Sequence, residues 1–149
     1  MEITITIKLD DCDLNKGDNK STETVISREP SIYARIFDDS YGKPLECINN
    51  PTYELLYLKS VEHHANERLK TDKYLYLNDV YRMLGIPTTW EGNCVGWVLD
   101  NPHGDGRVDF GIYEKWNLEF INGCKNPPLL DFNVDGDIRE KVLEIKWGA

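Results

Sequence analysis

Two short runs of alternating residues constrain the fold more than any other feature of the chain. Large apolar side chains occupy every second position of both runs, which are Val95, Trp97 and Leu99, and then Val108, Phe110 and Ile112. Residues two apart along a β-strand lie on the same face of a sheet. Each run therefore predicts a strand with one buried face. Since the connection over residues 100–107 is rich in turn residues, the two strands are expected to form a hairpin.

Burying both apolar faces together fixes the register of this predicted hairpin. A slip of one residue would turn the whole apolar set of one strand to the opposite face. The pairs that satisfy this condition are Leu99–Val108, Trp97–Phe110 and Val95–Ile112. The same register places Gly96 opposite Gly111 and leaves bare backbone on the outer face. Glycines within strands often mark the close approach of another backbone or of a ligand, and we expect a helix of the protein itself to fill this place.

The remaining patterns predict an α+β fold, in which a mostly antiparallel sheet packs against three helices. The chain of 149 residues fits a single domain over residues 1–149, with a β-rich part over 1–50. Apolar residues at helical spacing predict a longer helix at about 51–70, and shorter helices are expected at about 79–84 and 138–146. Strands are expected at 3–9, 23–27, 32–37, 74–77, 118–121 and 130–134, the first two of which could pair as a hairpin.

Residues that favour helix ends mark the limits of these helices. Pro51 suits the first turn of the longer helix. Asn78 is the predicted N-cap of the second helix, and Gly85 is the predicted left-handed residue after its last turn. Asp137, with Glu140 three residues later, is typical of a capping box at the start of the last helix.

The charge of the chain bears on its partners. The sequence has 26 acidic and 17 basic side chains, which give a net charge of −9, and the excess of acids is spread along the chain. Binding to phosphate backbones needs clustered Lys and Arg, so direct nucleic-acid binding is disfavoured. An acidic surface suits a basic protein partner, although solubility accounts for the same charge. No apolar run approaches the roughly 20 residues of a membrane span, and none is predicted.

The four cysteines are most simply expected as reduced thiols. No two of them are spaced as in C-x-x-C, and the N-terminus has no secretion signal. Cys94 and Cys124 lie in apolar surroundings and are expected to be small buried hydrophobic residues.

The candidate binding site lies around the predicted hairpin and its loop. Asp109 and Tyr113 flank the two glycines, and the loop adds His103 and Asp105. Carboxylate and imidazole groups perform acid–base chemistry or bind cations, although turns need the same Asp, Asn and Gly residues without any function. The polar side of the strand expected at 130–134 supplies two more residues. The whole candidate set is Gly96, Gly111, Asp109, Tyr113, Asp131, Asn133, Asp105 and His103.

Metal binding is only weakly indicated, and no cofactor is predicted. His63 and Glu67 are spaced four residues apart on the longer helix and could share a face, but a solvated helix face has the same pattern. Asp131, Asn133 and the following Asp135 match the start of a calcium-binding EF-hand loop. The last position of such a loop must supply a bidentate carboxylate, and here it is Val142, so an EF-hand is rejected.

The motifs of the second half of the chain, in their order, resemble an uncharacterised domain family of phage and mobile-element proteins from Gram-positive, often gut-dwelling bacteria. The resemblance covers about residues 63–142, and the N-terminal strands are expected to lie outside it. It implies no known activity and no catalytic residues. The motifs are ANE at 65–67, YLYLNDVY at 74–81, MLGIP at 83–87, VGW at 95–97, GDG at 104–106, VDFGIY at 108–113, FING at 120–123 and LLDFNVDG at 129–136.

These observations favour a non-enzymatic, protein-binding accessory of a phage or mobile element, which modulates or inhibits a nucleic-acid-handling or defence system of the host. The expected partner is a host or phage protein, and the expected location is the cytoplasm of the bacterial host. The alternative is a divalent-metal-dependent hydrolase or small-ligand-binding protein that uses Asp109, Asp131 and Asn133 with His103 or Asp105. A structural role in the virion is a further alternative. The oligomeric state cannot be deduced from the sequence.

Overall fold

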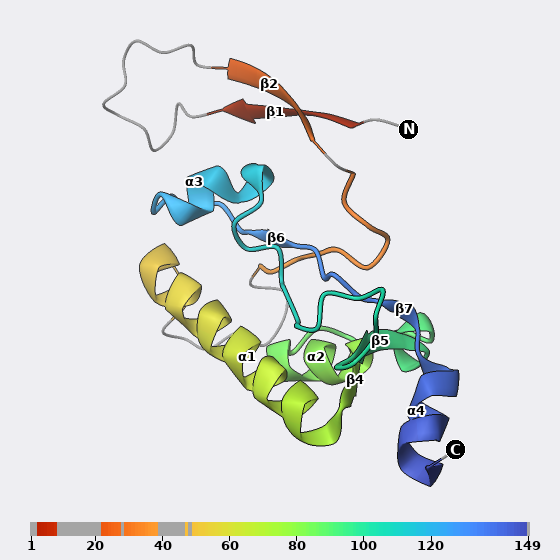
Figure 1. The fold of residues 1–149 in the computed structure, drawn as a ribbon. Helices are drawn as coiled ribbons and strands as arrows, with labels where there is room; N and C mark the ends of the chain where they lie inside the picture. The colour runs from red at the N-terminus through yellow and green to blue at the C-terminus, as the bar shows by residue number, and fades with distance from the viewer. Residues whose placement is uncertain (1–2, 9–21, 28, 39–46, 48, 149) are drawn as a thin grey trace.

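The computed structural model describes residues 3–8, 22–27, 29–38, 47 and 49–148 (Figure 1). Its strands are β1 (Ile3–Lys8), β2 (Thr22–Ser27), β3 (Arg35–Ile36), β4 (Tyr74–Tyr76), β5 (Val95–Val98), β6 (Leu129–Leu130) and β7 (Gly136–Asp137). Its α-helices are α1 (Pro51–Asp72), α2 (Leu77–Leu84), α3 (Leu118–Ile121) and α4 (Arg139–Trp147), and two 3₁₀ turns, η2 (Glu91–Asn93) and η3 (Lys115–Asn117), complete the described elements.

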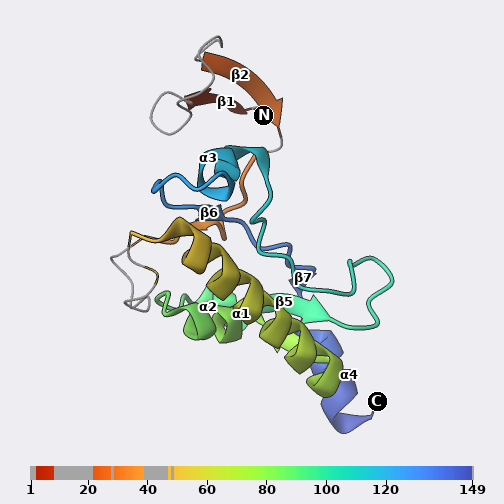
Figure 2. The ribbon, with the colours of Figure 1, turned by 90° about the vertical axis from the view of Figure 1, so that its left-hand side faces the viewer.

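The strands form three small antiparallel sheets, which confirms the α+β class. β1 pairs with β2, β3 pairs with β6, and the third sheet has the order β4-β5-β7. The N-terminal hairpin is therefore confirmed, with Ile5 opposite Val25. It lies at one end of the molecule and α4 lies at the other, as the two perpendicular views show (Figure 1, Figure 2).

The predicted hairpin between residues 95–99 and 108–112 is wrong. β5 is the central strand of its sheet, with Trp97 opposite Leu75 of β4 and Gly96 opposite Gly136 of β7. Residues 108–112 form neither helix nor strand. The alternating pattern was a correct sign of burial, because Trp97 and Phe110 both lie in the main core. It could not identify the neighbouring strand, because burial does not specify which strands pair.

The glycines predicted to face each other serve separate close contacts. A Cβ atom on Gly96 would lie 2.1 Å from the backbone oxygen of Leu75, so the neighbouring strand, and not a helix, excludes a side chain there. Gly111 has φ +69°, and a Cβ atom there would lie 2.8 Å from the backbone oxygen of Asp131. Both positions therefore require glycine for different reasons.

The longest helix follows its sequence pattern closely. The side chain of Asn50 caps α1 by accepting a hydrogen bond from the backbone N–H of Tyr53 (3.1 Å), and Pro51 begins the helix. Leu58 and Leu69 are buried against the main core. The helix ends two residues later than predicted, at a left-handed Lys73 whose N–H donates to the carbonyl of Leu69 (2.8 Å).

Two shorter elements differ from their predictions. α2 begins at Leu77, and Asn78 is not its cap because its side chain donates instead to the carbonyl of Thr89 (2.7 Å). Gly85 ends the helix with φ 76°, as expected. The expected strand at 118–121 is the helix α3. An apolar run of four residues does not distinguish a strand from a helical turn.

α4 packs on the face of the third sheet that is turned away from the main core. Its buried Val142 joins Ile138 and Val98 in a second hydrophobic cluster, beside Tyr74 and Tyr76. Ile138 is the N-cap, and the side chain of Asp137 accepts from the N–H of Arg139 (3.0 Å) instead of the predicted capping box. The helix is thus anchored by one face only.

The cysteines divide between two states. Cys94 is buried, with its sulfur 3.9 Å from the backbone oxygen of Trp90, as expected of a small hydrophobic residue. Cys124 is buried but disulfide-bonded, so the expectation of a reduced thiol is wrong for this residue. Within the described part of the chain, no helix combines the length and the apolar character of a membrane span.

Candidate functional site

The segment of residues 99–114, called the 99–114 loop below, contains neither helix nor strand, although Val108, Phe110 and Ile112 are buried. Buried backbone N–H and C=O groups outside regular structure need other hydrogen-bond partners. Asn, Asp and Glu side chains from distant parts of the chain supply these partners. Of the predicted candidate site, Asn133 supplies such partners from outside the loop, and Asp105 and Asp109 belong to the same hydrogen-bond network.

Asn133 lies at the centre of the hydrogen-bond network. Its Oδ1 accepts from the indole Nε1 of Trp97 (2.8 Å) and from the N–H of Asp109 (2.7 Å). Its Nδ2 donates to Oδ2 of Asp105 (2.8 Å) and to the carbonyl of Arg107 (3.0 Å). A carboxamide has two acceptor sites and two donor hydrogens. All of them are used here, so Asn133 ties the loop to β5.

Asp135 holds the start of the loop in a similar way. Its Oδ2 accepts from the N–H of Val98 (2.9 Å) and from Nδ2 of Asn101 (3.2 Å). A Cβ atom on Gly104 would lie 2.5 Å from Oδ1 of Asp135, so the loop passes directly over this carboxylate. Close packing against Asp135 therefore explains Gly104, the first glycine of the GDG motif.

Asp109 stabilises its own turn. Its Oδ1 accepts from the N–H of Gly111 (2.8 Å), which is the local side-chain-to-backbone bond that favours Asp in turns. Its Oδ2 forms an exposed ion pair with Arg107 (3.3 Å). Both carboxylate oxygens therefore have a partner within the loop.

Asp131 does not join this network, because its carboxylate holds a different segment. Only 2% of the residue is exposed. Its two oxygens accept from Oγ (2.6 Å) and the N–H (3.1 Å) of Ser31, a residue 100 positions earlier. The structure thus brings together Asp105, Asp109 and Asn133 of the predicted set and assigns Asp131 to the segment before β3.

Two side chains of α1 that are not in the predicted candidate site also hold the loop. Oε2 of Glu62 accepts from the N–H of Phe110 (2.8 Å). Asn66 both accepts from the N–H of Val108 (2.8 Å) and donates to its carbonyl (3.0 Å). Glu62 is half-buried, and this burial raises its pKa above the ordinary value of 4.5, while the hydrogen bond from Phe110 acts in the opposite direction. Asn is unfavourable within a helix. The presence of Asn66 in α1 was therefore a sequence signal for a role outside the helix.

Asn117 performs the same task at the end of the loop. Its Nδ2 donates to the carbonyls of Gly111 (3.0 Å) and Leu129 (2.9 Å), and its Oδ1 accepts from the N–H of Leu129 (2.8 Å). The residue is buried, with 2% of its surface exposed. Its sequence context, between Trp116 and Leu118, gives no sign of this role.

The other predicted site residues lie on the surface. His103 is exposed, and its backbone N–H donates to Oδ1 of Asn101 (3.0 Å). Tyr113 is 59% exposed, with the ammonium of Lys59 5.7 Å from its ring centroid. His63 and Glu67 are exposed on α1. Among the residues that the structure describes, no three His, Cys, Asp or Glu side chains are grouped so as to hold a metal ion.

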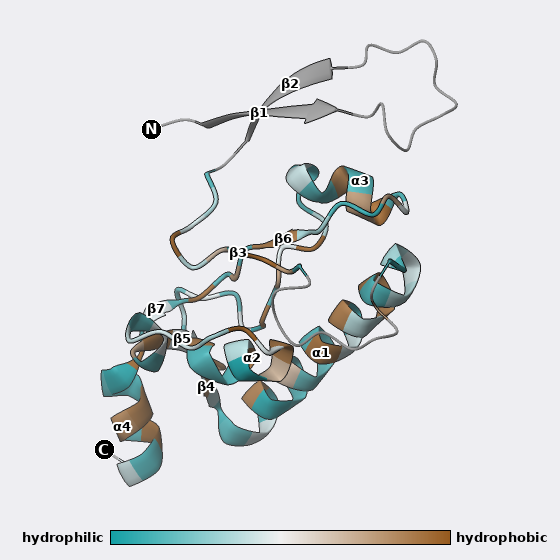
Figure 3. Ribbon diagram, turned by 180° about the vertical axis from the view of Figure 1, so that it is seen from behind, coloured by the Kyte–Doolittle hydropathy of each residue, from teal (hydrophilic) through white to brown (hydrophobic). Residues whose placement is uncertain are grey.

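A second surface has different chemistry, at the opposite end from the N-terminal hairpin. On α4, Leu143 is 56% exposed and Trp147 is 76% exposed. Residues four apart on a helix are neighbours on one face. Figure 3 shows hydrophobic segments on α4 at the edge of the molecule. The sequence pattern alone does not indicate this surface, because an amphipathic helix normally buries its apolar residues.

Acidic side chains accompany these two apolar residues. Glu140 and Glu144 are exposed, and their positions along the helix place them beside Leu143 and Trp147. We call these four residues the outer face of α4. A hollow of about 510 Å³ adjoins it, lined by Asp137, Arg139, Glu140 and Leu143.

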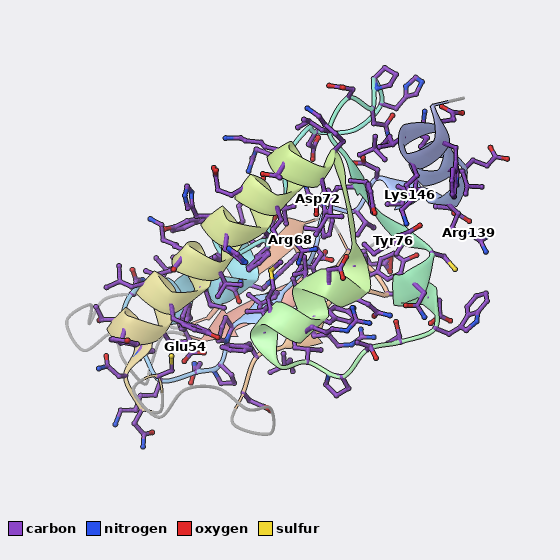
Figure 4. All side chains as sticks on the ribbon, turned by 90° about the horizontal axis from the view of Figure 1, so that it is seen from below. Glu54, Arg68, Asp72, Tyr76, Arg139 and Lys146 are labelled. Atoms are coloured by element: carbon purple, nitrogen blue, oxygen red, sulfur yellow. The ribbon has the colours of Figure 1, made fainter. Side chains whose placement is uncertain are left out.

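α4 carries three basic side chains, of which Figure 4 labels Arg139 and Lys146. Arg139 pairs with Asp137 (2.6 Å), and this hydrogen bond holds the pKa of the Asp137 carboxyl below its usual range. The ammonium of Lys146 lies 5.7 Å from the ring centroid of Tyr74, on the side of the sheet. Lys141 lines a groove of about 300 Å³ together with Glu144 and Val98. The pKa of the nearby Tyr76 hydroxyl is raised, and the largest cause is its burial.

A family model described as a family of unknown function (DUF6353) matches residues 3–142. The chain belongs to this family. The DUF6353 match begins in β1, so the expectation that the N-terminal strands lie outside the family pattern is wrong. No curated protein and no solved structure matched the chain. The motifs noted in the sequence lie within the matched residues, and they include Asn66, Asp109, Asn133 and Asp135, whose side chains form hydrogen bonds with the 99–114 loop.

Proposed function

We propose that this DUF6353 protein is a non-enzymatic accessory protein that binds another protein through the outer face of α4. The observation that carries the proposal is the pair of exposed apolar side chains, Leu143 at 56% and Trp147 at 76% exposure. Tryptophan is enriched among the residues that contribute most binding energy in protein interfaces. A helix that turns such a residue to solvent beside a second apolar residue has the composition of an interface core.

The way in which α4 is anchored supports the same proposal. Val142 and the N-cap Ile138 are buried against Val98 of β5, and they fix the helix to the sheet. Leu143 and Trp147 are therefore presented by a packed element and not by a loop. Preorganised apolar groups bind more tightly because less conformational entropy is lost on association.

The setting that we propose for this interaction is the cytoplasm of a bacterial host, with the protein encoded by a phage or mobile element. The support for this setting is the resemblance of the motifs between residues 63 and 142. A host or phage protein is the proposed partner, and a nucleic-acid-handling or defence system of the host is the proposed target. The charge of −9, spread along the chain, favours a protein partner over nucleic acid.

Affinity purification from lysate of the bacterial host tests the proposal. The intact chain should retain a specific partner, and Trp147→Ser should lose it. Trp90→Ser is the matched control, because Trp90 is 71% exposed but lies outside α4. Equal retention by the intact chain and both variants, or no specific partner for any of them, would contradict the proposal.

A further inference from the structure

We infer that the outer face of α4 binds a basic amphipathic helix of the partner protein. This inference rests on the proposed function and specifies the chemistry of the partner. It follows from the charges around Leu143 and Trp147. Glu140 and Glu144 are exposed there, and neither forms an ion pair with another residue in the described part of the chain.

The nearest basic groups do not neutralise these carboxylates. Arg139 uses Nε and Nη2 to donate to both oxygens of Asp137, at distances from 2.6 to 3.2 Å. Lys146 lies over the ring of Tyr74. Lys141 lines the same groove as Glu144 but, among the residues with a described structure, forms no ion pair with it. The outer face therefore combines two apolar side chains with two unpaired negative charges.

A ligand that complements this face needs apolar and basic groups together. Lys and Arg at the rim would meet Glu140 and Glu144, while aliphatic or aromatic side chains would cover Leu143 and Trp147. Amphipathic helices present such groups at positions i, i+3, i+4 and i+7. Opposite charges at a rim raise the association rate and select among partners more than they raise affinity. The negative charge of the whole protein acts in the same direction at longer range.

Selection from a displayed library of random peptides tests the inference with the intact protein as bait. Peptides that also bind the Trp147→Ser variant are discarded, because they bind a surface other than the outer face of α4. We expect the remaining peptides to carry net positive charge, with apolar residues at helical spacing. For these peptides, Trp147→Ser should weaken binding by about 30-fold or more, as for an interface hot spot. The pair Glu140→Gln and Glu144→Gln should weaken it by about 3- to 10-fold, and added salt should reduce that difference.

The controls separate this inference from the proposed function. Trp90→Ser should bind the selected peptides as the natural chain does, and all variants should unfold at similar temperatures because the replaced side chains are exposed. Peptides that depend on Trp147 but are neutral or acidic would overturn the inference and leave the proposed function standing. If no selected peptide depends on Trp147, both are overturned. A dimer in light scattering that Trp147→Ser makes monomeric would assign this face to a second copy and overturn the inference.

Discussion

Oδ1 of Asn133 lies 2.8 Å from Nε1 of Trp97 and 2.7 Å from the backbone nitrogen of Asp109. One side-chain oxygen thus joins the central strand of the third sheet to a loop without regular structure. Nδ2 of the same side chain donates to Oδ2 of Asp105 and to the carbonyl of Arg107. Asn133, a member of the predicted candidate site, therefore has a structural task.

Replacing Asn133 with Ala should destabilise the protein by roughly 2–4 kcal/mol, because the Trp97 indole and the Asp109 N–H would both lose their acceptor. Urea denaturation followed by tryptophan fluorescence would measure the free energy of unfolding. Asn122→Ala is the control, since Asn122 is exposed and should change stability by less than about 0.5 kcal/mol. Similar values for the two variants would show that the Asn133 network contributes little.

Gly111→Ala should destabilise the protein for two reasons. The left-handed backbone at φ +69° costs an L-residue about 1–2 kcal/mol. The new Cβ would also lie 2.8 Å from the backbone oxygen of Asp131. Gly123→Ala separates the two effects, because Gly123 has φ +97° but nothing within 4 Å of its Cβ position. Thermal unfolding should show a larger loss for Gly111→Ala, and an equal loss would exclude the steric effect.

Glu62 should make stability depend on pH. Burial raises its pKa above the ordinary value of 4.5, so protonation favours the folded state more than the unfolded state. Its contribution is then fully present below pH 4.5 and is lost as the pH rises through the raised pKa. Glu62→Gln, which keeps an oxygen for the N–H of Phe110, should abolish this loss.

Urea denaturation between about pH 4 and about pH 7 would measure this effect as the difference between the natural chain and the variant. Glu67→Gln is the control, because Glu67 is exposed on the same helix. If the stabilities of the natural chain and Glu62→Gln instead differ more toward low pH, the pKa of Glu62 is lowered and not raised.

The sequence could predict the elements that have long or strongly periodic patterns. The core positions Leu58 and Leu69 of α1, and the burial of Trp97 with Phe110, follow from spacing alone. Strand pairing could not be predicted, because Trp97 has its neighbour in Leu75 of β4 and not in the second alternating run. A periodic pattern shows which side of a strand is buried, but not which strand lies next to it.

The candidate site was predicted by residue type, and the same types serve two purposes. Asp and Asn oxygens that bind a ligand are equally able to accept from backbone N–H groups. Asn133 and Asp109 lie together as expected, but the 99–114 loop was not foreseen, because the alternation of Val108, Phe110 and Ile112 predicted a strand. The exposed Trp147 was not predicted, because the last helix was expected at about 138–146 and α4 extends to Trp147.

Divalent cations should leave the melting temperature almost unchanged. The oxygens of Asn133 and Asp109 already accept hydrogen bonds or form ion pairs, and those of Asp131 hold Ser31. A specific cation site would raise the free energy of unfolding by about 2.7 kcal/mol at a cation concentration 100 times its dissociation constant. Melts with Mg²⁺, Ca²⁺, Mn²⁺ and Zn²⁺ would detect this. A large shift that Asp105→Asn removes would instead support the metal-dependent alternative.

The most direct test of the account compares two positions for a photo-crosslinking amino acid, Trp147 on α4 and His103 on the 99–114 loop. Both side chains are exposed, so either can be replaced without disturbing the core. After irradiation in lysate of the proposed bacterial host, we expect a specific crosslinked protein at position 147 and none at position 103. Crosslinks at position 103 alone would contradict it, because the loop and not α4 would then be the binding surface.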